Sequence, residues 1–532
     1  MSKFIIVTGG VASSLGKGIT AASLGRLLIN RGLKVMVQKL DPYINVDPGT
    51  MSPYQHGEVF VTEDGAETDL DIGHYERFLD IDCHKNCNFT SGKIYSSIIT
   101  KERAGEYLGK TIQVIPHVTN EIKDDIKSVQ ADDIDVVIVE IGGTVGDMEG
   151  LAFLEAVRQL RMELGGENLM FLHVALLPYL DAAKELKTKP AQNSVKELTH
   201  IGIQPDILVC RTNSGIEITS EMKEKLAMFC NLKGPEYVIH NTDASCLYEV
   251  PLMLQKEGLD KIVCKQLKLK TKSPDMTEWK KMVAHIGKKK RQVEVAIVGK
   301  YTAVPDAYIS VTEALKHAGL ANDVDVKVKL VNSVEIEEQG AKELLSGLAG
   351  IVVPGGFGTR GIEGKILAAK YARENNVPYL GLCLGMQIAV IEFARNVIGW
   401  SDATSSEFDK ETKHNVIDIM EDQKNISDKG GTMRLGAYPC TLTKGTKAYE
   451  AYGKTHISER HRHRYEFNNK FKKDFEKHGM VISGINEKRD LVEVVEIPSN
   501  KFFVATQAHP EFKSHPYRSH PLFTAFIKAC KE

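Results

Sequence analysis

The chain has 532 residues, of which 42% are hydrophobic and 26% are charged, an ordinary balance for a soluble globular protein. Its 68 basic and 70 acidic side chains give a net charge of −2, which argues against a nucleic-acid partner. No apolar run approaches the ~20 residues that a membrane span needs. Nine scattered cysteines without a secretory pattern favour a reducing compartment. We therefore expect a cytoplasmic protein without a membrane segment, with two to four domains at roughly 150 residues per domain.

The first half of the chain alternates apolar runs with helical stretches. The runs are rich in Val and Ile and show no polar alternation, which is typical of strands buried on both faces of a parallel sheet. They are Phe4–Thr8, Val35–Leu40, Asp135–Glu140, Phe171–Leu177 and Ile207–Cys210. This half is expected to be an α/β domain.

A glycine-rich segment, residues 9–20, lies between the first predicted strand and a predicted helix over residues 21–30. Such a turn lets backbone N–H groups approach phosphate oxygens, and the start of a helix favours negative charge. Lys17 would add a point charge there. The spacing departs from the usual phosphate-loop pattern, because five residues separate Gly10 from Gly16 and Gly18 replaces Ser or Thr. A purely structural glycine-rich turn is therefore the alternative.

Carboxylates accompany this segment. Glu140 closes a predicted strand just before Gly142 and Gly143, and the carboxyl ends of parallel strands are where ligands bind. Asp69 and Asp71 are further candidates. Mg²⁺ binds nucleotides through a few carboxylates while it keeps waters and phosphate oxygens. Taken singly, such acids are more often solvated surface residues, but the position of Glu140 at a strand end beside two glycines favours a ligand.

Residues 266–292 change in character and are predicted to be a linker that carries one amphipathic helix. Ser273 is expected to cap that helix, with Pro274 at its first position and Asp275 in its first turn. Trp279, Met282, Val283 and Ile286 follow at helical spacing. The basic run at residues 288–291 has two interpretations, an import signal or a solvated end of the linker.

A second α/β alternation begins at residues 293–299, with further strands at Ile351–Val353 and Tyr379–Leu382. Cys383 follows the last of these between Gly381 and Gly385, the cysteine version of a nucleophile elbow. A buried, inert thiol is the alternative.

His509 and Glu511 could supply a general base and the carboxylate that orients it. The backbone N–H groups of Leu384 and Gly356 could form an oxyanion hole. These residues predict cleavage of an amide by thiolate attack.

Several blocks of this chain resemble the CTP synthase family. They are residues 10–18, 39–50, 55–69 and 187–190, and the second half resembles the class I glutamine amidotransferase domain of the same enzymes. The resemblance implies an N-terminal P-loop-like parallel-sheet amidoligase domain over residues 1–265, the linker 266–292, and an amidotransferase α/β domain over residues 293–532. It implies that UTP, ATP and glutamine give CTP, ADP, phosphate and glutamate, through a UTP phosphorylated on O4.

The resemblance also implies roles for individual residues. ATP would contact Ser14, Leu15, Gly16, Lys17, Gly18, Ile19, Asp71 and Asp243, with Mg²⁺ on Asp71 and Glu140 and with Lys39 supporting the transferred phosphoryl group. UTP, or CTP as product and feedback inhibitor, would contact Ser13, Asp147, Met148, Glu149, Lys187, Thr188, Lys189, Pro190, Ala191, Gln192 and Lys225. Glutamine would contact Gly356, Leu384, Gly385, Met386, Gln387, Glu407 and Arg464, near the catalytic Cys383, His509 and Glu511. The segments around Lys225 and Asp243 depart from the family pattern.

The family further implies GTP as an allosteric activator, acting at a loop with Phe357, Arg360 and Gly361, and a homotetramer. Two other interpretations stay open at this point. The chain could amidate a carboxylate, as cobyrinic-acid amide synthases do, although those are not expected to carry the blocks at residues 39–50 and 187–192. It could also be a scaffold or filament protein without catalysis, against which the complete set of reactive residues argues.

Overall fold

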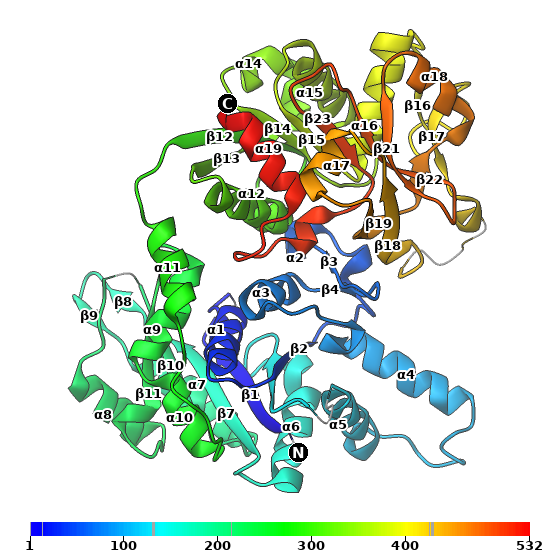
Figure 1. The fold of residues 1–532 in the computed structure, drawn as a ribbon. Coiled ribbons are helices and arrows are strands. Elements are labelled where there is room, and N and C mark those ends of the chain that lie inside the picture. The colour runs from blue at the N-terminus through cyan, green and yellow to red at the C-terminus, as the bar shows by residue number, and fades with distance from the viewer. Residues whose placement is uncertain (1, 13, 130–132, 214, 425, 427–429) are drawn as a thin grey trace. The chain divides into compact units, whose positions relative to one another are not determined.

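The computed structural model describes residues 2–12, 14–129, 133–213, 215–424, 426 and 430–532. They form two compact units, one made of Met1–Asp47 and Asp71–Ala284 and the other of Pro48–Leu70 and His285–Glu532. Each unit is built on its own α/β sheet, which confirms the predicted fold class (Figure 1). The short segment Pro48–Leu70 groups with the second unit although it lies far from it in sequence.

The first unit is built on a seven-stranded sheet in the order β11-β10-β7-β1-β6-β2-β5, and every neighbouring pair is parallel. Its strands are β1 (Lys3–Gly10), β2 (Val35–Asp41), β5 (Asn88–Thr90), β6 (Val136–Ile141), β7 (Leu169–Leu176), β10 (Ile207–Thr212) and β11 (Val238–Thr242). All five predicted strands are present among them. Because the strands are parallel, their carboxyl ends meet at one edge of the sheet.

Helices and a small hairpin complete the first unit. The helices are α1 (Lys17–Asn30), α3 (Leu70–Leu79), α4 (Ser91–Arg103), α5 (Thr119–Lys127), α6 (Leu151–Leu164), α7 (Lys189–His200), α8 (Ser220–Phe229), α9 (Val250–Lys256), α10 (Leu259–Gln266) and α11 (Thr277–Ile286). The hairpin pairs β8 (Tyr179–Leu180) with β9 (Glu185–Leu186). Apolar side chains of β1 and β6 pack with those of α4, α5 and α6 in one core.

Helix α11 is the helix predicted within residues 266–292. The predicted cap is wrong: the helix begins at Thr277, and Asp275 Oδ1 accepts a hydrogen bond from Thr277 N at 3.0 Å. An N-cap side chain accepts a hydrogen bond from the backbone N–H two or three residues later, and Asp275 does this with Thr277. Asp275, and not Ser273, therefore caps the helix. Trp279 is fully buried and donates to Tyr248 O at 2.7 Å. The predicted apolar stripe therefore fixes this helix to the first unit.

The second unit is built on a nine-stranded sheet in the order β13-β12-β14-β15-β23-β22-β21-β18-β19, parallel from β13 to β23 and antiparallel beyond. The strands are β12 (Gln292–Gly299), β13 (Asp325–Asn332), β14 (Gly350–Val353), β15 (Tyr379–Leu382), β18 (Arg434–Leu442), β19 (His456–His463), β21 (Val481–Asn486), β22 (Leu491–Glu496) and β23 (Phe503–Thr506). A smaller sheet contains β16 (Thr404–Ser405), β17 (Asn415–Ile419) and β20 (Tyr465–Phe467).

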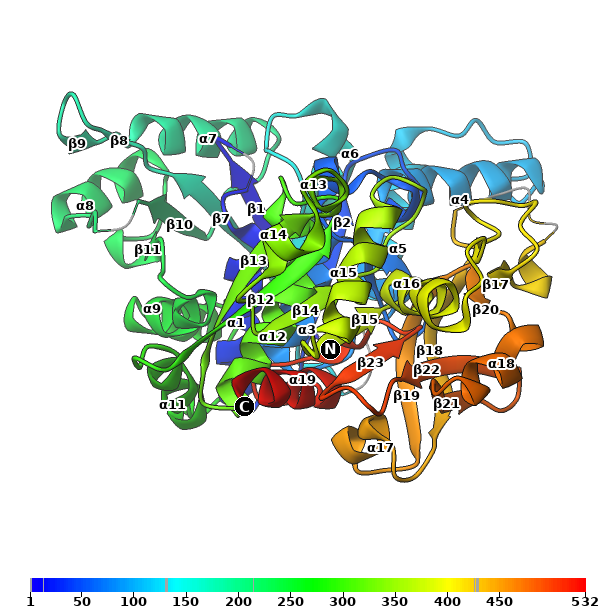
Figure 2. The ribbon, with the colours of Figure 1, turned by 90° about the horizontal axis from the view of Figure 1, so that it is seen from above.

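Helices cover both faces of this sheet (Figures 1 and 2). On strand β12, Val295 and Ile297 pack with α12 (Ile309–Ala321) and α19 (Pro521–Lys531), whereas Ala296 and Val298 pack with α15 (Ile362–Glu374) and α16 (Leu384–Phe393). The shorter helices are α2 (Pro53–His56), α13 (Ser333–Gln339), α14 (Ala341–Leu345), α17 (Lys447–Tyr452) and α18 (Lys472–Lys477). Successive residues of β12 thus face opposite layers, as expected for a strand buried on both sides.

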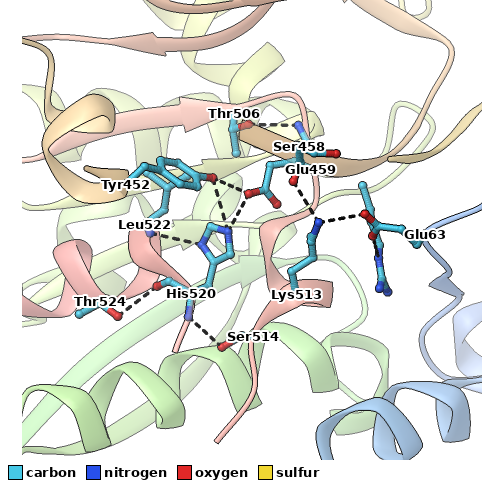
Figure 3. A network of polar contacts seen from close by, with 12 residues as sticks. Glu63, Tyr452, Ser458, Glu459, Thr506, Lys513, Ser514, His520, Leu522 and Thr524 are labelled. Atoms are coloured by element: carbon cyan, nitrogen blue, oxygen red, sulfur yellow. Dashed lines mark hydrogen bonds and ion pairs between the residues drawn. The ribbon is translucent and has the colours of Figure 1, made fainter. Parts of the chain in front are cut away.

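Polar contacts attach Pro48–Leu70, with its hairpin β3 (Phe60–Val61) and β4 (Glu67–Thr68), to the second unit. Figure 3 shows Lys513 Nζ between Glu63 Oε1 at 3.1 Å and Ser458 O at 3.0 Å. The buried Arg460 also binds Glu63, with Nε 2.9 Å from Oε2. In the same network His520 Nε2 lies 3.0 Å from Glu459 Oε1. These contacts fix the hairpin against β19.

Candidate functional sites

The phosphate-loop candidate lies at the carboxyl end of β1. Gly16 has φ 80° and directly precedes α1, so the backbone turns sharply into the start of a helix. A Cβ on Gly9 would lie 2.6 Å from Lys17 Cδ, and one on Gly18 would lie 2.2 Å from Asp71 Oδ1. Both positions therefore need glycine, because Lys17 and Asp71 pass close to the backbone. Ser14, Leu15 and Ile19 share this loop and helix start, whereas Ser13 lies outside the described residues.

Lys17 is buried, and its Nζ donates to Gly143 O at 2.7 Å, beyond the end of β6. Burial lowers the pKa of Lys17 below its ordinary value, although Glu140 acts in the opposite direction. Lys17 therefore contacts the glycine pair Gly142–Gly143 that follows Glu140.

A cluster of buried charges surrounds the predicted metal ligands. Lys39 and Glu140 are register partners on the neighbouring strands β2 and β6. Lys39 Nζ lies 3.2 Å from Glu140 Oε1 and forms a closer ion pair with Asp71. Tyr75 donates a hydrogen bond to the other oxygen of Glu140. The two predicted ligands therefore converge on one ammonium group.

Burial raises the pKa of Glu140, and Lys39 and Lys17 only partly offset it. Burial would also raise the pKa of Asp71, but Lys39, His74 and Lys17 together outweigh it and the pKa falls. Asp41 is a further buried carboxylate at this site that was not predicted from the sequence, and burial raises its pKa to about 6. Its position at the end of β2 is the signal that could have identified it. Such opposed shifts at one sheet edge are typical of a functional site.

The residues predicted to bind UTP lie in three places near the same edge. Asp147, Met148 and Glu149 are exposed in the loop after β6. Residues 187–192 run from β9 into α7, where Thr188 and Ala191 are buried. Lys187 pairs with Glu185, and the charge of Lys225 on α8 also acts on Glu185. Lys187 therefore contacts Glu185, and Lys225 lies within electrostatic range of the same carboxylate.

Asp243 follows the last residue of β11, and its Oδ1 pairs with Arg211 at 2.6 Å. It therefore lies at the same edge of the sheet as Gly10, Asp41 and Glu140. Among the described residues no hydrogen bond or ion pair joins Asp243 to the phosphate loop.

A hydrogen-bonded chain links β1 to the helix of the UTP segment. Thr8 Oγ1 lies 2.9 Å from His173 Nδ1, and His173 Nε2 lies 2.8 Å from Ser194 Oγ on α7. Burial lowers the pKa of His173 to about 3, so the imidazole is neutral. A Cβ on Gly10 would lie 1.7 Å from Ser194 Oγ, so α7 packs directly on the start of the phosphate loop.

Cys383 in the second unit has the strained backbone of a nucleophile elbow, with φ 52° and ψ −103° between β15 and α16. A Cβ on Gly381 would lie 2.7 Å from the carbonyl carbon of Gly385, and one on Gly385 would lie 2.0 Å from Val353 O. The predicted G-x-C-x-G spacing therefore has a steric cause. Gln507 Nε2 lies 3.7 Å from the Cys383 sulfur.

His509 Nδ1 lies 2.7 Å from Glu511 Oε1, as predicted for a base and its orienting carboxylate. Burial lowers the pKa of His509, but the neighbouring Glu511 and Cys383 outweigh burial and raise the pKa to about 10. A Cβ on Gly355 would touch both His509 and Cys383, at 2.7 and 3.6 Å from their nearest atoms. Glu511 and Cys383 thus both favour the protonated imidazole of His509.

Cys383, His509 and Glu511 line a cavity of about 350 Å³ in the second unit. Gly356 and Arg464 also line it, and Arg464 donates to Gln423 Oε1 at 2.5 Å and Thr432 Oγ1 at 2.8 Å. Leu384 neighbours Gly356, since a Cβ on Gly356 would lie 3.4 Å from Leu384 Cδ2.

The other predicted glutamine contacts are placed as follows. Gly385 and Met386 are buried in the first turn of α16. Gln387 is buried and donates to Tyr465 O at 2.9 Å. Glu407 Oε1 accepts from Gly358 N at 2.9 Å. These contacts place Gln387 and Glu407 around the elbow and the Pro354–Gly358 loop.

Part of the wall of this cavity was not predicted from the sequence. Its wall includes Gly49, Thr50, Met51, Pro53, Glu58 and Val59, together with Tyr301, Tyr308 and Arg462. Arg462 holds the early segment in place, because its Nε lies 2.7 Å from Glu67 Oε1 and its NH2 lies 2.9 Å from Gly49 O. No local pattern in the sequence indicates this long-range pairing.

The fold and the site define a glutamine amidotransferase joined to a nucleotide-binding parallel-sheet unit. The family model described as CTP synthase N-terminus matches residues 3–269, and the one described as glutamine amidotransferase class-I matches residues 303–529. The chain belongs to the CTP synthase family. It is therefore a glutamine-hydrolysing ligase that aminates UTP to CTP in pyrimidine biosynthesis.

Curated relatives match over the whole length. CTP synthase of Bacillus subtilis is 58% identical over 100% of this chain and 99% of its own, and that of Clostridium beijerinckii is 60% identical over the same shares. A solved structure described as the Trypanosoma brucei CTPS glutaminase domain with bound acivicin is 43% identical, covers 45% of this chain and 94% of its own, and has a TM-score of 0.43. In the described part of the chain, no helix is long and apolar enough to cross a membrane.

Proposed function

We propose that the two sites divide the reaction, with ammonia released at Cys383 and used at the phosphate loop of the first unit. The observation that carries this proposal is the convergence of Cys383, His509 and Glu511 on one cavity in a chain that also holds Lys17, Lys39, Asp71 and Glu140 at a sheet edge. Neither set of residues can perform the chemistry of the other.

In the glutaminase half, the Cys383 thiolate attacks the glutamine carboxamide, and the N–H groups of Gly356 and Leu384 stabilise the oxyanion. His509, oriented by Glu511, protonates the leaving ammonia. Water then cleaves the thioester and releases glutamate and the free thiol. Gln387, Glu407 and Arg464, with Gly385 and Met386, hold the substrate. An arginine fork suits the α-carboxylate and a carboxylate suits the ammonium group.

In the synthetase half, residues 14–19 bind the ATP phosphates, Asp243 borders the ATP site, and Lys39 supports the γ-phosphoryl group as it moves to O4 of UTP. Ammonia adds at C4 and phosphate leaves. Ser13, Asp147–Glu149, residues 187–192 and Lys225 bind UTP, or CTP as feedback inhibitor. Lysines suit a triphosphate because an ammonium group needs no bidentate geometry.

Asp71 and Glu140 suit Mg²⁺, because both are oxygen donors and their carboxylates already converge on one cation. The bound ion would neutralise phosphate charge during transfer. We further propose GTP as activator at Phe357, Arg360 and Gly361, a homotetramer, and a cytoplasmic location. The proposed domains are residues 1–265, a linker over 266–292, and 293–532. All of these extend family properties to this chain.

The test is a Lys17→Ala variant assayed with UTP, ATP, Mg²⁺ and glutamine. CTP formation should fall by about 10²-fold or more, because an electrostatic contact to the transferred phosphate is lost. Glutamine hydrolysis to glutamate, followed in parallel, should persist. Loss of both activities together, in a folded variant, would contradict the division of labour.

A further inference from the structure

Lys365, on α15 in the second unit, is a buried lysine that the proposed glutaminase chemistry leaves without a role. Its side chain is 1% exposed. Within the described part of the chain its ammonium group forms no hydrogen bond and no ion pair, and its electrostatic neighbours are Lys300, Cys383 and Glu407. A buried ammonium group without a bonded partner costs folding free energy. A residue that costs stability at this position calls for a functional explanation.

The ammonium group of Lys365 lies close to Gly356, one of the two proposed oxyanion donors. A Cβ on Gly356 would lie 3.5 Å from Lys365 Nζ, on the side where the Leu384 side chain also packs. Lys365 Nζ and the Leu384 side chain therefore both lie next to Gly356, one of the two proposed oxyanion donors. It lies within electrostatic range of the nucleophile Cys383.

Other charges fix the same loop. Lys300 Nζ donates to Phe357 O, and Gly358 N donates to Glu407 Oε1 at 2.9 Å. Each of these residues holds one peptide group of the Pro354–Gly358 loop. Lys365 is different, because its ammonium group forms no hydrogen bond and acts on Cys383 and Glu407 through its charge alone.

We propose that Lys365 is a positioning residue that supplies positive charge next to Gly356 of the oxyanion hole and favours the Cys383 thiolate and the oxyanion that forms from it. The inference rests on the proposed glutaminase role of Cys383. An opposite charge a few ångströms away stabilises an anion strongly where water is excluded. The effect is reciprocal, since the thiolate also favours the protonated lysine. Cys383 and Glu407 act to raise the pKa of Lys365, whereas burial and Lys300 lower it, and the resulting pKa is about 7.

The test measures how fast iodoacetamide alkylates Cys383 as a function of pH, with the modified peptide quantified by mass spectrometry. Lys365→Met removes the charge at similar length and should move the pH midpoint of alkylation up by about one unit. Lys365→Arg keeps the charge and should restore the wild-type midpoint. Lys370→Met is the matched control on the same helix, at a half-buried lysine that is not among the charges acting on Lys365, and should leave the midpoint unchanged.

Below the wild-type midpoint, Lys365→Met should also lower kcat/KM for glutamine hydrolysis about tenfold. CTP formation from added ammonia should stay at the wild-type rate. A wild-type alkylation midpoint in Lys365→Met overturns the proposal. If that variant does not fold, Lys365→Gln takes its place under the same criteria. Absence of CTP from ammonia in the wild-type protein would instead contradict the proposed function, so the two failures are distinguishable.

Discussion

At the scale of single residues, the glycines around Cys383 are as necessary as the thiol. Gly385→Ala would drive a methyl group into Val353 O, which lies 2.0 Å from the added Cβ and belongs to the backbone of a central strand. We expect a loss of about 1–3 kcal/mol in stability, typical of overpacking, and loss of glutaminase activity. Thermal unfolding and glutamate release measure the two effects. A variant with wild-type glutaminase activity would contradict the steric account of the elbow.

Lys365 gives a pH-dependent stability prediction at the same scale. Its folded pKa of about 7 lies below the ordinary 10.5, so the unfolded chain binds more protons between these values. Burial of the charged lysine therefore lowers the free energy of unfolding by its full amount below pH 7, and this destabilisation disappears as the pH rises toward 10.5. Lys365→Met should raise the melting temperature at pH 6 by about 2–4 °C, and the gain should shrink at pH 10. A gain that is equal at both pH values would contradict a charge penalty.

At the scale of elements, the chain Thr8–His173–Ser194 fixes α7 against β1. Ser194→Ala removes one hydrogen bond at the helix that carries part of the proposed UTP segment. We expect KM for UTP to rise about fivefold, from the loss of about 1 kcal/mol, while glutamine hydrolysis is unchanged. Steady-state kinetics with each substrate varied in turn measure this effect. An equal loss in both activities would indicate a general folding defect.

Elements built from local pattern were predictable from sequence. The Val- and Ile-rich runs of the first half form parallel strands, and the glycine spacing around Cys383 forms the sharp turn between β15 and α16, both as predicted. The predicted N-terminus of α11 was wrong, because Asp275 accepts the capping hydrogen bond that was expected at Ser273. Asp41 and Lys365 were missed, since burial of a single charged side chain leaves no periodic signal.

At the scale of the whole molecule, the allocation of residues 48–70 to the second unit could not be predicted from local pattern. Ion pairs such as Arg462–Glu67 and Arg460–Glu63 join residues about 400 positions apart, and no window of sequence contains both partners. The segment supplies part of the cavity wall around Cys383. The glutaminase cavity therefore depends on residues 48–70, which lie more than 200 positions before the rest of the second unit.

If Cys383 makes ammonia for a separate synthetic site, the two halves of the reaction can be separated by one substitution. Cys383→Ala is assayed for CTP with glutamine and, separately, with ammonium chloride at a pH that supplies free ammonia. We expect glutamine-dependent CTP formation to be abolished while ammonia-dependent formation stays at the wild-type rate. Loss of both activities in a folded variant, or retention of glutamine-dependent synthesis, would contradict it.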